Sequence, residues 1–197
     1  MTIIKVAEAA FPTEFGDFRI FGFETPDKSD SAAVLVMGNL STVEAPLVRI
    51  HSQCLTGDVF SSSRCDCGAQ LALAQKTIAE AGIGILIYHL QEGRGIGLMN
   101  KLQAYQLQDA GHDTVTANHQ LGFEADHRNY GLCVEILRHF GVTKTRLMSN
   151  NPRKLLALEE AGIIIAERVP IEIAPTDETQ RYLLTKKAKL GHLLSAV

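Results

Sequence analysis

A helical segment that ends at a glycine, followed by a run of β-branched apolar residues, occurs three times along the chain. The predicted helices span residues 70–81, 129–140 and 152–161, and the predicted strands span residues 83–88, 143–148 and 163–169. Gly82, Gly141 and Gly162 would supply the left-handed residue that ends each helix. Continuous apolar runs are typical of strands buried on both faces of a sheet, so the alternation predicts a layered α/β domain with parallel strand pairs.

The first third of the chain has a different pattern. Two apolar segments flank Pro12 and Gly16, which predicts a hairpin, and two further strands follow: Ala7–Phe11, Asp17–Glu24, Ala32–Met37 and Leu47–His51. We therefore expect one mixed sheet with helices on both faces. Another helix is predicted over Ile96–Asp109. No repeat or linker interrupts the chain, so residues 1–197 are expected to form a single domain, with the tail from residue 175 as the candidate for a mobile segment.

Composition and charge exclude several classes of function. The chain has 197 residues, of which 46% are hydrophobic, and a formal net charge of −3. This balance argues against nucleic-acid binding by bulk charge. No segment reaches the ~20 apolar residues that span a bilayer, and Lys5 and Glu8 interrupt the N-terminus, which argues against a signal peptide. We expect a cytoplasmic protein without a membrane partner, and cytoplasmic thiols stay reduced, so the four cysteines need an explanation other than disulfides.

Three of the cysteines, Cys54, Cys65 and Cys67, lie close together in the sequence. Thiolates are good zinc ligands, and a Cys-x-Cys pair can offer both sulfurs to one ion if the chain turns there, as Gly68 would permit. Arg64 beside the cluster would favour the thiolate form. Three protein ligands with a vacant fourth position are what hydrolysis needs, because a water held there becomes acidic.

Two alternatives remain for this cluster. His51, at the end of an apolar strand, or Cys133, on an apolar helical face, would make it a closed structural zinc site with four ligands. A cysteine placed like Cys133 is more often a small core residue. The other alternative is that the cluster binds no metal.

A loop rich in glycine and charge follows the predicted strand 83–88. It contains Glu92 and Arg94 among glycines at 93, 95 and 97, and it lies where α/β folds place ligands, beyond the carboxyl end of a strand. A solvated surface pair is the alternative for the two charged residues. The chain has no P-loop motif, which excludes a conventional P-loop GTPase.

Two more segments are candidates for binding an anion. Asn151 and Pro152 are typical of a helix start, yet the basic residues Arg153 and Lys154 occupy the first turn, where the helix dipole favours acidic side chains. An anion docked there would remove the conflict, and a mildly unfavourable exposed turn is the alternative.

The polar segment 113–130 is long for a connection in a compact domain, which is often a sign of function. Asp126 could act as a base and Arg128 could bind phosphate. Two ordinary surface residues are the alternative.

Taken together, these segments resemble the GTP cyclohydrolase II family. The resemblance covers nearly the whole chain and rests on ordered motifs: RIHSQCLTGD from Arg49, RCDCG from Arg64, HLQEGRGIGL from His89, DTVTANHQLGF from Asp113, NNPRK from Asn150 and YLLTKKAKLGHLL from Tyr182.

The resemblance implies a homodimer with one zinc ion per chain, held by Cys54, Cys65 and Cys67, and Mg²⁺ that helps to hold the triphosphate. Family members convert GTP to formate, pyrophosphate and 2,5-diamino-6-(5-phosphoribosylamino)pyrimidin-4(3H)-one, the first step of riboflavin biosynthesis. Carried over by position, the GTP site is lined by Arg49, Ile50, His51, Ser52, Gln53, Gln70, Glu92, Gly93, Arg94, Thr114, Ser149 and Lys154.

The resemblance also implies three catalytic residues. Tyr105 corresponds to an active-site tyrosine needed for ring opening, Arg128 to the residue proposed to attack the α-phosphate, and Asp126 to its proton acceptor. Opening an imidazole ring requires a nucleophile at neutral pH, which zinc chemistry can supply. The guanidinium of Arg128 stays protonated, so an electrostatic role at the phosphates is chemically easier than nucleophilic attack.

The sequence departs from the usual family pattern at three positions: Gln53 stands where glutamate is common, Leu90 where arginine is common, and Ser149 where threonine is common. These departures keep open a GTP-binding paralogue with an altered product or no activity. A binding module with a structural zinc is the alternative from a different class.

Overall fold

A computed structural model of the chain describes residues 2–124 and 126–197, except for the side chains of Thr114 and Arg181. The chain divides into two compact units, each built from several segments. Unit 1 comprises residues 1–51, 71–90 and 130–171, and unit 2 comprises residues 52–70, 91–129 and 172–197. The expectation of a single domain over residues 1–197 stays a prediction.

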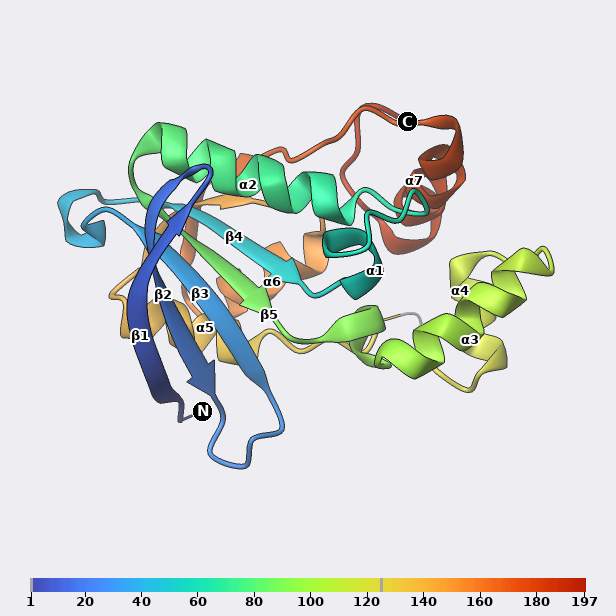
Figure 1. Ribbon diagram of the computed structural model, residues 1–197, viewed down its shortest axis with the longest axis horizontal. Coiled ribbons are helices and arrows are strands. Elements are labelled where there is room, and N and C mark those ends of the chain that lie inside the picture. The colour runs from blue at the N-terminus through green and yellow to red at the C-terminus, as the bar shows by residue number, and fades with distance from the viewer. Residues whose placement is uncertain (1, 125) are drawn as a thin grey trace. The chain divides into compact units, whose positions relative to one another are not determined.

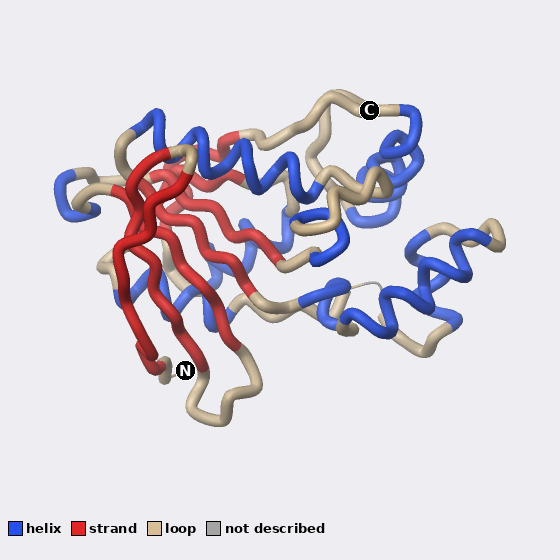
Figure 2. The backbone as a smooth tube through the Cα atoms, viewed as in Figure 1, coloured by secondary structure: helices blue, strands red, loops and turns tan. Residues whose placement is uncertain are grey.

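The described residues of unit 1 build one seven-stranded sheet (Figures 1 and 2). The strands are β1 (Ile4–Thr13), β2 (Gly16–Glu24), β3 (Ser31–Met37), β4 (Leu47–Ser52), β5 (Gly84–His89), β6 (Lys144–Met148) and β7 (Ile164–Val169). Their order across the sheet is β1-β2-β3-β5-β4-β6-β7. The pairs β1–β2, β2–β3 and β3–β5 are antiparallel, whereas β4–β6 and β6–β7 are parallel. The predicted hairpin, mixed sheet and parallel pairs are thereby confirmed.

Helices cover both faces of this sheet, as predicted (Figure 1). They are α2 (Cys67–Ala81), α5 (Gly131–His139) and α6 (Pro152–Glu160), and a short 3₁₀ helix, η1 (Leu40–Thr42), follows β3. Successive residues of a strand point to opposite faces. Val34 accordingly belongs to the same core cluster as Leu132 of α5 and Leu158 of α6, whereas its neighbour Leu35 belongs to the cluster that contains Ile78 of α2.

The glycines predicted to end three helices have the expected backbone conformation. Their φ angles are 69° at Gly82, 70° at Gly141 and 79° at Gly162, in the region that suits glycine. The apolar run after Gly162 differs from the prediction, since β7 is not buried on both faces and Ile164 is 60% exposed. The reason is its place at the edge of the sheet, beside β6 alone.

Unit 2 consists mainly of helices and loops. Its elements are α1 (Leu55–Asp58), the first residues of α2, the 3₁₀ helix η2 (Glu92–Gly95), α3 (Leu98–Asp109), α4 (Thr114–Gln120) and α7 (Asp177–Leu190). The predicted helix 96–109 is confirmed as α3, which begins two residues later.

Two segments of unit 2 are more regular than the sequence indicated. The polar connection 113–130 contains α4, which begins where the Asp113 side chain accepts hydrogen bonds from two backbone N–H groups. The tail contains α7, which begins with reciprocal hydrogen bonds between Thr176 and Thr179. Mobility of the tail stays a prediction. Across the described residues, no helix combines the length and apolar character required to cross a membrane.

Candidate metal and nucleotide site

The three cysteines predicted to bind a metal converge in unit 2. Cys54 directly precedes α1, and Cys67 begins α2, two residues after Cys65. Their Sγ atoms all lie within 4.8 Å of one another, and those of Cys54 and Cys65 are 3.7 Å apart. Zinc–sulfur bonds of about 2.3 Å in a tetrahedron place two sulfurs about 3.8 Å apart. The spacing and the thiol donors therefore fit a zinc ion.

Two glycines permit this convergence. A Cβ atom at Gly57 would lie 2.9 Å from Sγ of Cys65 and 3.3 Å from Sγ of Cys54. A Cβ atom at Gly68 would lie 2.3 Å from the carbonyl oxygen of Gly57. Gly68 lies in the first turn of α2, so it serves by allowing close backbone approach and not as a separate turn residue.

Lys101 of α3 is a cation that contacts Cys54, and the sequence reasoning missed it. Its Nζ donates to Sγ of Cys54 at 3.2 Å and to Oε1 of Glu92 at 2.8 Å. Arg64, which was expected to act on the thiols, pairs instead with Asp109 at 2.7 Å. The sequence feature that could have indicated Lys101 is a single positive charge near the start of a predicted helix, where the helix dipole disfavours it.

Hydrogen bonding sets the protonation of the cluster. Bonds from the thiols of Cys65 and Cys67 hold the pKa of Cys54 well below its ordinary value, and the positive charge of Lys101 lowers it further. The same bonds to Cys54 raise the pKa of Cys65 and of Cys67. Among the three sulfurs the hydrogen bonds therefore favour the thiolate at Cys54, and a bound zinc ion would displace the thiol protons.

Neither of the residues considered as a fourth ligand groups with the three cysteines in the described structure. Cys133 is fully buried in the core of unit 1, where burial raises the pKa of its thiol to about 12. His51 also belongs to unit 1, and its ring stacks on that of Tyr88 with 5.5 Å between the centroids. Among the His, Cys, Asp and Glu side chains that the structure describes, the group able to hold a metal consists of the three cysteines. This favours an open site over a closed one.

Tyr105 of α3 stands beside the cluster. Its hydroxyl lies 3.1 Å from Oγ1 of Thr56, and that oxygen lies 3.7 Å from Sγ of Cys54. Burial raises the pKa of Tyr105 above its ordinary value, so the phenol keeps its proton at neutral pH. The structure therefore brings the predicted active-site tyrosine next to the three cysteines.

Arg128 and Asp126 form a bidentate ion pair. The Nε and Nη2 atoms of Arg128 donate to the two carboxylate oxygens of Asp126 at 2.8 and 2.6 Å, and Nη1 lies 3.3 Å from Oγ of Ser52. Asp126 is 7% exposed, so the interpretation of both as ordinary surface residues is wrong. The planar fork of the guanidinium is fixed as a cation in this geometry.

The glycine-rich loop forms η2, and its two charged side chains have separate roles. Glu92 is buried and accepts hydrogen bonds from the backbone N–H groups of Leu55 at 2.7 Å and Gly93 at 2.7 Å, in addition to Lys101. It therefore joins the loop to the start of α1, and the solvated pair with Arg94 is not formed.

Arg94 has two unusual features. It adopts a left-handed φ of 62°, which is rare for a residue with a side chain. Its Nη1 atom is buried, and no hydrogen-bond partner for it occurs within the part of the chain that is described. The backbone N–H of His127 donates to the carbonyl of Arg94 at 3.0 Å, which ties this loop to the segment carrying Asp126 and Arg128.

Another group of predicted nucleotide-binding residues lies in unit 1, at the carboxyl ends of the neighbouring parallel strands β4 and β6. Arg49 is buried and donates through Nη1 to the carbonyl of Met148 at 3.0 Å. Lys154 is 5% exposed, and its Nζ donates to the carbonyl of Ile50 at 2.8 Å. The alternative of a mildly unfavourable exposed turn is therefore wrong for Lys154, whose side chain is buried.

The start of α6, which follows β6, forms as predicted. The side chain of Asn151 accepts from the backbone N–H of Arg153 at 3.0 Å, and Pro152 begins α6. Oγ of Ser149 accepts from the backbone N–H of Asn151 at 3.1 Å. Parallel sheets commonly bind ligands beyond such strand ends.

The remaining predicted residues belong to unit 2. Nε2 of Gln70 donates to Asp66 at 2.5 Å. Ser52 contacts Arg128, and Gln53 is half-buried directly before Cys54. Thr114 is the first residue of α4, but its side chain lies outside the described part of the structure. The residues proposed to bind GTP are thus divided between the two units.

The family model for GTP cyclohydrolase II matches residues 4–170. The chain belongs to the GTP cyclohydrolase II family. A GTP cyclohydrolase-2 of Cronobacter sakazakii is 54% identical over 195 residues, which is 99% of both chains. The GTP cyclohydrolase-2 of Salmonella typhimurium is also 54% identical, over 99% of this chain and 100% of its own.

A longer relative contains the same region as part of a larger protein. The riboflavin biosynthesis protein RibBA of Chlorobium phaeovibrioides is 52% identical over 97% of this chain but only 47% of its own length. With full-length similarity to GTP cyclohydrolase-2 enzymes, the chain is an enzyme of this family. A binding module with a purely structural zinc is thereby excluded.

Proposed function

We propose that the chain opens the imidazole ring of GTP at C8 and releases formate and pyrophosphate. The product would be 2,5-diamino-6-(5-phosphoribosylamino)pyrimidin-4(3H)-one, and the reaction would be the first step of riboflavin biosynthesis. The observation that carries the proposal is the spacing of three sulfurs suited to zinc beside Tyr105, in a chain of this family.

Cys54, Cys65 and Cys67 would hold one zinc ion per chain. When bound, zinc would supply Lewis-acid chemistry that makes water a nucleophile at neutral pH. Lys101 contributes by offsetting the negative charge of three thiolates, since its ammonium is already fixed against Cys54 and Glu92. Tyr105 keeps its proton at neutral pH and would donate it to a ring nitrogen during opening.

Arg128 would act at the phosphates as a fixed cation. Two of its nitrogen atoms are held by Asp126, which supports electrostatic stabilisation of the leaving pyrophosphate over nucleophilic attack by the guanidinium. Asp126 would then orient Arg128 and keep it charged. The rival role, in which Asp126 takes a proton from an attacking Arg128, requires this ion pair to break.

The buried Nη1 of Arg94 supports an anionic or carbonyl-bearing ligand in unit 2. A donor buried without an acceptor is costly, by about 1–3 kcal/mol, unless a ligand satisfies it. A phosphate oxygen or the guanine carbonyl of GTP offers such an acceptor. Mg²⁺ would help to hold the triphosphate. A homodimer in the cytoplasm, without nucleic acid or membrane as a partner, remains our expectation for the assembled enzyme.

One assay tests the proposal directly. Purified protein is incubated with GTP and Mg²⁺, and formate, pyrophosphate and the pyrimidinone are quantified together with the zinc content. Cys65→Ser should lose zinc and formate release while keeping its fold by circular dichroism, because the large core cluster of unit 1 does not include Cys54, Cys65 or Cys67. Zinc at full occupancy in Cys65→Ser would refute the ligand assignment, and absence of formate from the zinc-loaded parent would favour an inactive paralogue.

A further inference from the structure

The side chain of Asp66, between Cys65 and Cys67, is held by a helix from the other end of the chain. Asp66 is 5% exposed. Nζ of Lys186 in α7 donates to its Oδ1 at 3.1 Å, and Nε2 of Gln70 donates to its Oδ2 at 2.5 Å. Its carbonyl also accepts from the backbone N–H of Gln70 at 3.0 Å. Both the side chain and the backbone of the residue between two metal ligands are therefore fixed.

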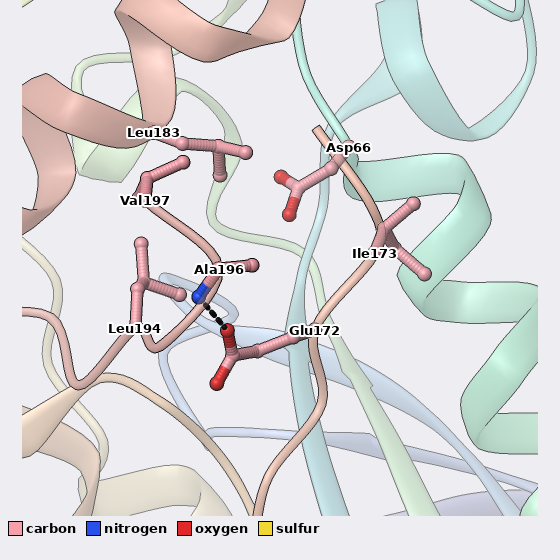
Figure 3. A pocket seen from close by; sticks show the side chains of 7 residues that line it. All are labelled: Asp66, Glu172, Ile173, Leu183, Leu194, Ala196 and Val197. Atoms are coloured by element: carbon pink, nitrogen blue, oxygen red, sulfur yellow. Dashed lines mark hydrogen bonds between the residues drawn. The ribbon is translucent and has the colours of Figure 1, made fainter. Parts of the chain in front are cut away.

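Other side chains of α7 lie close to the contact between Lys186 and Asp66. Lys186 follows Tyr182 by four residues, which places both side chains on the same face, and Nζ lies 4.2 Å from the centre of the Tyr182 ring. Leu183 is 3% exposed and lines a small cavity together with Asp66 (Figure 3). The Lys186 side chain is itself only 13% exposed, so it has little freedom to leave Asp66.

The residues after α7 are tied back in the same unit. The carboxylate of Glu172 accepts from the backbone N–H groups of Ser195 at 2.9 Å and Ala196 at 3.0 Å, and from the Ser195 hydroxyl at 3.0 Å. Figure 3 shows the bond to Ala196 beside Asp66 and the other residues that line the cavity. Leu194, Ala196 and Val197 of the C-terminal segment thus line the same cavity as Asp66.

We propose that α7 is part of the metal site, and that Lys186 is a positioning residue that orients the Cys65–Cys67 turn through its ion pair with Asp66. The inference rests on the proposed zinc site. The directions of the two sulfurs in a Cys-x-Cys turn depend on the backbone of the middle residue, and a tethered Asp66 fixes that backbone before a metal arrives. Lys186 lies beyond residue 170, where the match to the family model ends.

Charge supports the same arrangement. Three thiolates around a Zn²⁺ ion carry a net charge of −1, and the carboxylate of Asp66 adds a further negative charge next to them. Lys186 offsets this charge from the side of α7, in a setting where burial weakens screening by water. Residues that orient metal ligands in this way typically change metal affinity by about 10- to 100-fold when they are replaced.

The test measures zinc binding by the full chain. Lys186→Met, Asp66→Asn and the double variant are compared with the parent for zinc content after dialysis, for zinc affinity in competition with a chromophoric chelator, and for the thiolate-to-metal absorption of the Co²⁺-substituted protein. Lys189→Met is the matched control, because Lys189 is on the same helix and also forms an ion pair, with Asp113 at 2.8 Å.

We expect Lys186→Met and Asp66→Asn each to weaken zinc binding about 10- to 100-fold and to alter the Co²⁺ spectrum. The double variant should bind zinc as tightly as the single variant of lower affinity, because each substitution removes the same contact. Lys186→Arg should recover most of the affinity, and Lys189→Met should match the parent. If metal-free Lys186→Met is unfolded, Asp66→Asn and Lys186→Arg decide the question.

Unchanged zinc affinity and spectrum in Lys186→Met overturn the inference, as does an equal loss in Lys189→Met. A parent protein that binds no zinc has a different meaning, since it overturns the proposed metal site itself and the positioning role with it.

Discussion

Nζ of Lys101 lies 3.2 Å from Sγ of Cys54. The same ammonium donates to Glu92, whose carboxylate also accepts from the backbone at the start of α1. Burial alone would lower the pKa of Lys101, but the hydrogen bond to Glu92 and the negative charge of Cys54 raise it well above its ordinary value. A permanently charged side chain therefore links a predicted metal ligand to the glycine-rich loop.

Lys101→Met should weaken zinc binding by about tenfold or more, because it removes the positive charge that contacts Cys54. Chelator competition measures the change. Lys76→Met is the control, since Lys76 is an exposed residue of α2 in a surface pair with Glu80. Lys101→Arg should retain part of the affinity. If Lys101→Met binds zinc as tightly as the parent, the contact with Cys54 has no role in holding the metal.

Arg128→Ala should lower the rate of pyrophosphate release about 10²- to 10³-fold, because it removes a fixed cation from the proposed phosphate site. Zinc content should be unchanged, since the three cysteines do not depend on it. Arg128→Lys keeps the charge but loses the bidentate contact with Asp126 and should be intermediate. Formate and pyrophosphate are quantified separately in reactions that are quenched at successive times. Undiminished pyrophosphate release by Arg128→Ala would remove this residue from the mechanism.

Lys154→Met should have two separable effects. Loss of the bond from Nζ leaves the buried carbonyl of Ile50 without this donor, which should lower the free energy of unfolding by about 1–3 kcal/mol in urea denaturation. If Lys154 also binds the triphosphate, KM for GTP should rise, more strongly at low salt where charges are least screened. Lys144→Met is the control, because Lys144 lies outside this helix start and pairs with the exposed Glu44. Reduced stability with an unchanged KM would assign Lys154 to structure alone.

Gln53→Glu tests the departure closest to the metal ligands. A carboxylate there would add negative charge beside three thiolates and make a zinc-activated water less acidic, whereas an amide relieves that charge. We expect kcat for formate release to stay within about tenfold of the parent, which corresponds to about 1.4 kcal/mol, with the alkaline limb of the pH profile moved. An inactive parent that gains formate release in Gln53→Glu would instead identify a degenerate copy.

Much of the fold was predictable from local pattern. Several features depend only on residues that are close together in the sequence, so the sequence alone could indicate them. They are the glycines that end α2, α5 and α6, the hairpin β1–β2 and the helix cap at Asn151. The exposure of β7 could not be predicted, because an apolar run does not record whether a strand has a neighbour on both sides. Edge position is a property of the whole sheet.

The metal ligands were predictable for a different reason. Cys54, Cys65 and Cys67 are close in sequence, and their chemistry restricts what they can do. The residues around them come from distant segments: Lys101 approaches from α3, and Lys186 reaches Asp66 from a position 120 residues later in the sequence. Composition and spacing assign no partner to a single lysine, because ion pairing depends on which helix faces pack together. The sequence by itself determined the family, the α/β class and the three sulfurs, and only the tertiary structure decided which charges stand beside them.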